Sequence, residues 1–503
     1  MTDINKLRNQ IDEIDSKLTE LFQKRMETVE KVAEYKKLNG ISTNDPSREQ
    51  QVIEKHLPEV EEKWQPYYRD FQEELFTLSK KYQDDKNNRD DPFVKYGMDF
   101  SEYRDAAFNA SQAARKALLR NPDTINATIG SLCGDDGTIM AFDSVYDAYD
   151  KVPNKRKASY AGGIQGNPDF NEAVFSWVNR LDNIKIPHRN IATPGGTGAL
   201  SLAVTNLLNK RETLLIPSIA WGSYRVMAGQ HDLKIDTYQL FDDNKVSIRG
   251  IKEKCREVMD RQGKVVIIIN DPCQNPTGNT MGKKLWEELI EFLNKLSEEG
   301  PVSIINDIAY FDYAVDWQNS TDYMECFNNI TENMLAVICF SCSKTLTAYG
   351  MRVGNAIILA RKEETADHLY NTFIRTARAS WSNVNNGFMD CFVKMVSENK
   401  EGFLREKQEA LDVLKKRSQI FISEAEECGL PLYPYREGFF ATLRIEDDDL
   451  LNRYYENLNR NDIYTVRFSK GIRVALCGIP TDKCRGLAQK MKIILYETES
   501  QAD

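Results

Sequence analysis

The chain has 503 residues, enough for two to four domains, and carries a formal net charge of -10 at pH 7. Its basic residues are interspersed with acidic ones and form no stripe, which argues against a nucleic-acid-binding protein. The sequence shows no membrane span, and its start, MTDINKLRNQ, lacks the apolar core of a secretory signal, so we expect a cytoplasmic protein.

The first segment has apolar residues at heptad-like spacing from Ile4 to Tyr35, which predicts one long helix. Arg25 falls where this spacing calls for an apolar residue, and a charge there is costly unless it is paired. Lys36 lies on nearly the same face about 16 Å away, so the two cations are placed to bracket a small dianion. Arg8 is about 25 Å from Arg25, and only an antiparallel partner helix would bring it back. The alternative is an amphipathic helix used only for dimerisation.

The segments LRNQIDEID, QKRMETVEKVAEYK, NDPSREQQVIEK and FTLSKKYQ together resemble the all-helical chorismate mutases. The resemblance implies an all-α domain over residues 1–85 that rearranges chorismate to prephenate. This unimolecular reaction needs a shaped cationic cage and no nucleophile. The pocket residues that the resemblance implies are Arg8, Arg25, Lys36, Arg48, Glu49, Ser79 and Gln83.

The resemblance also implies roles for these residues. Arg8 of a partner chain, with Arg25 and Arg48, would hold the two carboxylates in the reactive conformer, which is a positioning effect. Lys36 and Gln83 would bond the ether oxygen as its carbon–oxygen bond breaks, so that their stabilisation grows toward the transition state.

A charged, proline-ended stretch without aliphatic residues, DDKNNRDDP, follows the helical segments and predicts a linker. We therefore divide the chain into a helical domain over 1–85, a linker over 86–95 and a second part over 96–503.

Beyond the linker, two segments combine an apolar strand with residues that suit a phosphate and a pyridine ring. In IATPGGTGALSLAVTNLL, glycines precede a predicted amphipathic helix whose first amides, around Thr197, can hold an anion. In VVIIINDPCQNPTG, a buried parallel strand leads to a turn at which Asn275 is placed to face a ligand.

Two further strands carry the most reactive residues. In VSIINDIAYFDY, Asp307 is placed to keep a pyridine nitrogen protonated, and Tyr310 to donate to a ring oxygen. The run LAVICF leads to Lys344, with Arg352 eight residues later. Burial would lower the pKa of Lys344 and free its amine to attack the aldehyde of pyridoxal phosphate.

Each motif alone has an ordinary explanation as a reverse turn, a flexible loop or a helix cap. Their order along the chain, each at the carboxyl end of a strand, favours one ligand site. Cys339 and Cys342 form a C-x-x-C pair near Lys344, but no second pair or nearby histidine completes a metal site. We expect no metal and no disulfide scaffold.

Residues from about Phe93 onward resemble the fold-type I pyridoxal phosphate aminotransferases of the aspartate and aromatic class. The resemblance implies an α/β large domain with a mostly parallel sheet at about 146–365. An arm and a small α/β domain would take up about 96–145 and 366–503. The implied cofactor ligands are Lys344, Asp307, Tyr310, Asn275, Gly196, Thr197, Ser341, Arg352, Tyr160 and Trp221, and the implied substrate ligands are Arg473 and Gly130.

By the resemblance, Tyr160 reaches the phosphate of a neighbouring subunit, which implies a homodimer with shared sites, and Arg473 grips the substrate carboxylate with its planar fork. Two positions depart from the pattern. Gly195 replaces a phosphate-binding serine, and the spacing after Trp221, the residue expected to stack on the ring, is one residue off. No second arginine for a distal carboxylate is identified.

The sequence thus predicts a bifunctional enzyme of phenylalanine and tyrosine biosynthesis that makes prephenate and transaminates either prephenate or an aromatic 2-oxo acid. In one alternative, the helical domain is a non-catalytic aromatic sensor or dimerisation module. In a remote alternative, the chain is an aminotransferase-like transcription regulator, which the acidic balance and long helix of the first 90 residues oppose.

Overall fold

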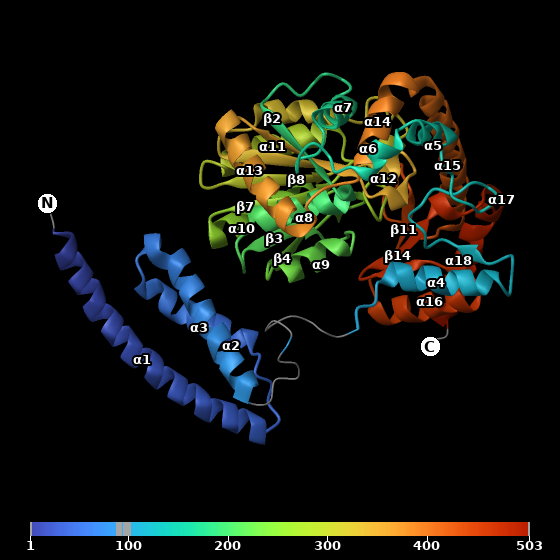
Figure 1. The fold of residues 1–503 in the computed structure, drawn as a ribbon. Coiled ribbons are helices and arrows are strands. Elements are labelled where there is room, and N and C mark those ends of the chain that lie inside the picture. The colour runs from blue at the N-terminus through green and yellow to red at the C-terminus, as the bar shows by residue number, and fades with distance from the viewer. Residues whose placement is uncertain (1–2, 87–92, 94–101, 501–503) are drawn as a thin grey trace. The chain divides into compact units, whose positions relative to one another are not determined.

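A computed structural model describes residues 3–86, 93 and 102–500. The chain divides into two compact units, residues 1–103 and 104–503 (Figure 1). The predicted linker over 86–95 lies outside the described residues except for Lys86 and Phe93.

The described part of the N-terminal unit is built from helices: α1 (Ile4–Leu38), α2 (Pro46–His56), α3 (Gln65–Lys86) and two short 3-10 turns, Leu57–Glu59 and Glu62–Trp64. Aspartate residues cap the N-termini of two of these helices. The side chain of Asp3 accepts a hydrogen bond from the Asn5 amide at α1, and that of Asp45 accepts one from the Arg48 amide at α2. The predicted single long helix is confirmed.

Helix α1 buries little of its own surface. Among its described residues only Ala33 is buried, and it contacts α3 through its second half, where Lys86 pairs with Glu30 and Glu34. The first half presents a row of exposed apolar side chains, which are Ile4, Leu7, Ile11, Ile14, Leu18 and Leu21. An exposed apolar row of this kind is typical of an interaction surface, and the described residues of one copy of the unit do not cover it.

A seven-stranded sheet forms the centre of the second unit, in the order β2-β10-β9-β8-β7-β3-β4. Its strands are β2 (His188–Thr193), β3 (Thr213–Pro217), β4 (Lys234–Tyr238), β7 (Val265–Asn270), β8 (Val302–Asp307), β9 (Met334–Ser341) and β10 (Gly354–Ala360). Neighbours run parallel except β10, which is antiparallel to β2 and β9. The apolar runs of β7, β8 and β9 are buried on both faces, as a sheet covered by helices requires.

Helices cover both faces of this sheet (Figure 1). One face packs against α8 (Gly195–Leu207), α9 (Ser223–Gln230) and α13 (Glu363–Ser380). The other packs against α7 (Pro168–Val178), α10 (Ile248–Gln262), α11 (Lys283–Leu296) and α14 (Asn386–Glu398). Short elements join these layers, which are α5 (Asp143–Asp150), α6 (Asn154–Ala158), α12 (Cys342–Thr345) and the pair β5 (Phe241–Asp242) and β6 (Lys245–Val246).

A smaller layer follows the long helix α15 (Lys400–Cys428). It holds the antiparallel strands β11 (Phe440–Arg444), β13 (Val466–Phe468) and β14 (Gly471–Ala475), and the parallel pair β1 (Ile125–Asn126) and β12 (Ile463–Tyr464). Its other helices are α16 (Asp448–Arg460), α17 (Thr481–Cys484), α18 (Leu487–Ser500) and α4 (Ala106–Leu118). Strand β1 and helix α4 come from the start of the second unit, but they belong to the layer that the C-terminal part of the chain forms.

One expected element differs in detail. The glycines of the GGTG run lie inside the first turn of α8, since the helix begins at Gly195, and α8 is buried on most sides instead of amphipathic. Its neighbours β9, β10 and α13 enclose it. Among the described residues, no helix is both long and apolar enough to cross a bilayer.

Candidate functional sites

The carboxyl ends of β7, β8 and β9 border a cavity of about 420 Å³ in the second unit. Ligands of α/β proteins bind at such strand ends. The cavity brings together most of the residues singled out from the sequence, which are Gly130, Gly196, Thr197, Trp221, Asn275, Asp307, Tyr310, Ser341, Lys344, Arg352 and Arg473. Tyr160 is not among the residues that line it and is 83% exposed.

Lys344 follows β9 in the four-residue helix α12, and its amine faces the cavity. Its Nζ donates a hydrogen bond of 2.7 Å to the carbonyl oxygen of Gly130 and lies 4.6 Å from the ring centroid of Tyr349. Burial, together with the charges of Arg473 and Arg352, lowers the pKa of Lys344 to about 8. A substantial share of these amines is therefore neutral, and so nucleophilic, near physiological pH.

Asp307 is the last residue of β8, and its carboxylate is held by two donors. Tyr224 donates from its hydroxyl to Oδ2 at 2.6 Å, and the backbone amide of Ala309 donates to Oδ1 at 3.0 Å. Burial raises the pKa of Asp307, while these two hydrogen bonds and the charge of Lys344 oppose that rise. The result is a carboxylate fixed by two hydrogen bonds in the lining of the cavity.

Sequence reasoning missed Tyr224, which lies on α9 and is fully buried. The only signal was its place three residues after Trp221, and those two rings meet edge to face with centroids 5.6 Å apart. Trp221 itself lines the cavity despite its unexpected spacing. Pairing between α9 and the end of β8 is a tertiary contact that local pattern does not reveal.

Two asparagines fix the turn after β7. The amide of Asn270 donates to the carbonyl oxygen of Asp307 at 2.8 Å, and its Oδ1 accepts from the backbone amide of Asn275 at 2.7 Å. Asn275 precedes Pro276 through a cis peptide bond. These contacts tie the turn to the end of β8, so Asn275 and Asp307 are presented together.

One end of the cavity is built for an anion. Gly196 and Thr197 lie in the first turn of α8, and Arg352 reaches the same end with bonds to Ser343 Oγ at 3.2 Å and Pro194 O at 3.4 Å. Gly195 has a φ of +74°, and a Cβ there would lie 2.7 Å from Arg352 Nη2. Only glycine lets the guanidinium come this close, and helix amides beside an arginine suit a phosphate.

Arg473 enters the cavity from β14 and is buried. Its Nη2 donates to Thr128 O at 2.9 Å and its Nη1 to Asn275 Oδ1 at 3.3 Å, while its Nε finds no acceptor among the described residues. Burial lowers the pKa of this arginine. A buried guanidinium with a spare donor suits a carboxylate ligand.

Helix α4 supplies further lining residues that the sequence did not single out, including Phe108, Ser111 and Arg115. Arg115 is exposed and forms no hydrogen bond or ion pair with the described residues. Among the described residues, the lining therefore contains four cations, Lys344, Arg352, Arg473 and Arg115, against the single carboxylate of Asp307. This balance favours a ligand with several negative charges.

In the N-terminal unit, a smaller polar cluster lies between α1 and α3. Arg25 Nη1 donates to Ser79 Oγ at 2.5 Å and to Leu75 O at 3.4 Å. Ser79 and Gln83 are buried one turn apart, and Gln83 Oε1 has no partner among the described residues. Burial lowers the pKa of Arg25.

The other predicted pocket residues of this unit have partners of their own or are exposed. Lys36 is half-buried and donates to Thr43 O at 3.1 Å, and Glu49 pairs with Lys80 at 2.9 Å. Arg8 and Arg48 are exposed. The structure thus brings Arg25, Ser79 and Gln83 together and leaves Arg8 on the uncovered half of α1.

Comparison with known proteins finds a family model that matches each of the two units. The model of the family "Aminotransferase class I and II" matches residues 122–491, and that of "Chorismate mutase type II" matches residues 7–84. An aspartate aminotransferase of Salmonella typhi is 24% identical over 74% of this chain and 94% of its own. An aromatic-amino-acid aminotransferase of Escherichia coli is 22% identical over 52% of this chain and 66% of its own.

Solved structures show the same fold. An aminotransferase from Anaerococcus prevotii superposes with a TM-score of 0.76 at 29% identity, covering 81% of this chain and 99% of that one. An aromatic-amino-acid aminotransferase from Burkholderia pseudomallei, covalently bound to pyridoxal phosphate, has a TM-score of 0.65 at 18% identity, covering 80% and 100%.

The chain belongs to the class I and II aminotransferases, a family that depends on pyridoxal phosphate. Its first helices form a chorismate mutase domain of type II, so one polypeptide combines an isomerase with a transferase.

Proposed function

We propose that the large cavity binds pyridoxal phosphate and transaminates prephenate with a dicarboxylic amino donor, while the helical unit makes that prephenate from chorismate. The observation that carries this proposal is the set of four cations around one cavity. Arg352 and the first amides of α8 take the phosphate, Lys344 takes the aldehyde, and Arg473 takes the α-carboxylate. Arg115 is left for a second carboxylate.

Pyridoxal phosphate, when bound, supplies an aldehyde and an electron-withdrawing ring. Asp307 holds the proton on the ring nitrogen, and Tyr224 keeps that carboxylate in place. Tyr310 and Asn275, which line the cavity after β8 and β7, would bind the ring oxygen. Lys344 supplies a neutral amine and moves a proton at the substrate α-carbon, a task for which its lowered pKa suits it.

Two carboxylates distinguish prephenate from phenylpyruvate and 4-hydroxyphenylpyruvate, which carry one. Aspartate and glutamate also carry two, so donor and acceptor would use Arg473 and Arg115 in turn. A guanidinium that binds the second carboxylate favours prephenate, because an acceptor without that carboxylate loses the charge-assisted hydrogen bonds. Phenylpyruvate is therefore the poorer acceptor under this proposal.

In the helical unit, the half-buried Arg25 bonded to the buried Ser79 supports a pocket for the mutase reaction, as does Gln83 Oε1, which has no partner among the described residues. The pocket is completed by Arg8 of a second copy, whose α1 covers the exposed row from Ile4 to Leu21. We therefore propose a homodimer in which each mutase site draws on both chains. Tyr160, exposed on its own chain, is proposed to reach the second aminotransferase site.

The test is to supply the purified chain with chorismate, pyridoxal phosphate and glutamate or aspartate, and to resolve the products by chromatography. Arogenate, the amination product of prephenate, is the expected product. Prephenate that accumulates without amination contradicts the acceptor assignment, and unchanged chorismate makes the helical unit a sensor or a dimerisation module.

The role of Arg115 is tested with Arg115→Gln beside Lys116→Gln, a neighbouring charge on α4 that does not line the cavity. We expect Arg115→Gln to lower kcat/KM for prephenate by about 30-fold and for phenylpyruvate by less than about 3-fold. Equal losses for both acceptors would contradict the assignment.

A further inference from the structure

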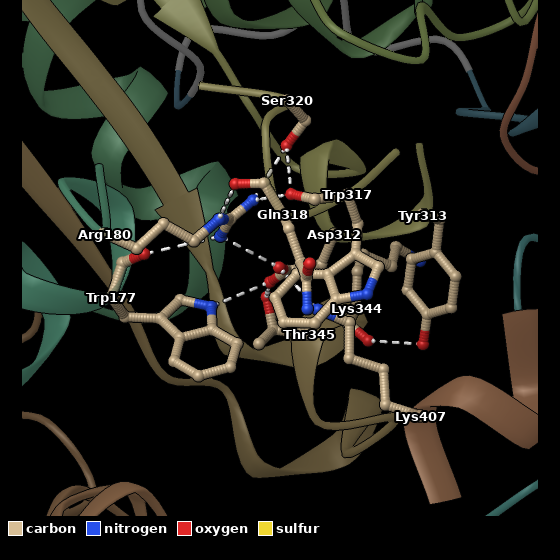
Figure 2. A network of polar contacts seen from close by, with 10 residues as sticks. All are labelled: Trp177, Arg180, Asp312, Tyr313, Trp317, Gln318, Ser320, Lys344, Thr345 and Lys407. Carbon is tan, nitrogen blue, oxygen red and sulfur yellow. Dashed lines mark hydrogen bonds and ion pairs between the residues drawn. The ribbon is translucent and has the colours of Figure 1, made fainter. Parts of the chain in front are cut away.

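A buried ion cluster lies next to the segment that carries Lys344, and its charged residues are not among those that line the cavity (Figure 2). Its centre is Asp312, in the short turn after β8. Lys407 of α15 donates to Asp312 Oδ1 at 2.7 Å, and Arg180, after α7, donates to the same oxygen at 3.2 Å. The side chains of Asp312 and Lys407 are each 1% exposed.

Aromatic rings enclose the two cations. Lys407 Nζ lies 3.4 Å from the ring centroid of Trp317, and the Arg180 guanidinium lies 5.0 Å from the same ring. Burial alone would raise the pKa of Asp312, but the charges of Lys407 and Arg180 bring that pKa below its ordinary value. Burying three charges is costly and seldom stabilises a fold more than apolar packing would. A role in the site explains their presence better than stability does.

The cluster is bonded directly to the segment that carries Lys344. The hydroxyl of Thr345, the next residue, donates to Asp312 Oδ2 at 2.7 Å. Tyr313, the residue after Asp312, donates from its hydroxyl to the carbonyl oxygen of Lys344 at 3.0 Å. Asp312 Oδ2 also accepts a hydrogen bond from Trp177 Nε1 at 3.0 Å, which anchors Asp312 to α7.

Helix α12 needs such support, because it spans only Cys342–Thr345 and a helix of one turn does not hold itself. Lys344 points its amine into the cavity and its carbonyl toward Tyr313. The Tyr313 hydrogen bond therefore holds the Lys344 carbonyl, and the Thr345 hydrogen bond holds the next side chain, while the amine faces the cavity.

We propose that Asp312, with Lys407, Thr345 and Tyr313, is a positioning device that fixes the peptide of Lys344 and so sets the direction of its amine. This inference rests on the proposed role of Lys344 as the cofactor-binding lysine. Through Lys407 the device also links that lysine to α15, the helix that leads into the smaller layer.

Removing the Asp312 carboxylate would leave the buried Lys407 without its anion, and removing Lys407 would leave the buried Asp312 with Arg180 as its remaining cation, so both variants are at risk of not folding. Milder variants test the device: Thr345→Val and Tyr313→Phe, alone and combined, each of which deletes one hydroxyl. The matched control is Tyr238→Phe. Its buried hydroxyl also donates to a backbone carbonyl at 3.0 Å, that of Ile268, and Tyr238 does not line the cavity.

Three quantities are measured on the holoenzyme: kcat and KM for transamination, the pH midpoint of the visible absorption of the bound cofactor, and the midpoint of thermal unfolding. We expect the double variant to lose about 10- to 100-fold in kcat with KM changed less than about 3-fold. The absorption midpoint should move by about half a pH unit or more. Tyr238→Phe should lower the unfolding midpoint by a similar amount and leave kcat and the absorption midpoint unchanged.

The inference is overturned if the double variant loses no more kcat than Tyr238→Phe at a comparable unfolding midpoint, or if the absorption midpoint stays in place. Mutase activity of each variant serves as the folding standard. The wild-type chain distinguishes failure of this inference from failure of the proposed function. If the wild-type chain binds no pyridoxal phosphate, the proposed function and the positioning role are both wrong. If it transaminates and the variants are equally active, only the positioning role is wrong.

Discussion

The hydroxyl of Tyr224 lies 2.6 Å from a carboxylate oxygen of Asp307, and both side chains are buried. A hydrogen bond to a charged group in such surroundings contributes more than an ordinary one, about 1.5–3 kcal/mol. It also lowers the pKa of Asp307, which burial alone would raise. Tyr224 therefore favours the ionised carboxylate, the form that the proposed role at the ring nitrogen requires.

Tyr224→Phe deletes this hydrogen bond and leaves the ring in place. We expect kcat for transamination to fall by about 10- to 100-fold and the Kd for pyridoxal phosphate to rise, because Asp307 becomes easier to protonate. Tyr454→Phe, which loses a buried hydroxyl bonded to Met491 O at 2.9 Å, is the matched control. Wild-type kinetics in Tyr224→Phe would refute the role.

The lowered pKa of Lys344 makes a prediction for the cofactor-free protein. Its amine is half neutral at pH about 8, so the rate of pyridoxal phosphate capture should rise about tenfold from pH 7 to pH 9 and then level off. An ordinary lysine, with a pKa of 10.5, would instead gain about a hundredfold over that range without levelling. Stopped-flow absorbance measures the rate, and Lys344→Ala should capture none.

Gly195→Ala places a Cβ 2.7 Å from Arg352 Nη2 on a backbone with φ +74°. The left-handed conformation costs an alanine about 1–2 kcal/mol, and the arginine must move away from the phosphate site. We expect the Kd for pyridoxal phosphate to rise about tenfold or more. Gly229→Ala is the control, since a Cβ there meets no atom within 4 Å; an equal effect in both variants would show general destabilisation instead.

Arg25→Gln separates the mutase from the sensor interpretation. We expect chorismate turnover to fall about a thousandfold, because the guanidinium that holds a carboxylate of the reactive conformer is lost, while transamination of added prephenate is unchanged. Lys24→Gln removes a neighbouring exposed charge that pairs with Glu20, and it should leave both activities intact. Retained turnover in Arg25→Gln, with altered regulation of the aminotransferase, would favour the sensor.

Local patterns predicted much of the fold and the centre of the cavity. The apolar runs of β7, β8 and β9 and the polar residues after them are consecutive in sequence, so their strands and ligand ends were readable. Tyr224, Arg115 and the Asp312 cluster could not be predicted from local patterns, because each makes its contacts with residues that are distant in the sequence. Arg115 reaches the cavity only because α4 folds back onto β12 and β13, more than 300 residues later.

The Tyr160 and Arg8 assignments both place the residue in a site of a second copy of the chain. Both residues are exposed, which is compatible with a partner's site. For Trp221, one copy of the chain is enough. Its irregular spacing in the sequence did not determine whether it would reach the cavity, and its position just before α9 places it in the lining.

The exposed apolar first half of α1 has a consequence for mixtures of two inactive variants. In a dimer of the proposed kind, each pocket takes Arg8 from one chain and Arg25 from the other. A preparation of Arg8→Ala and one of Arg25→Ala would each be inactive as a mutase. Mixed and allowed to exchange subunits, they would form hybrids in which one pocket carries both defects and the other carries none. Chorismate turnover would then reappear from two inactive proteins.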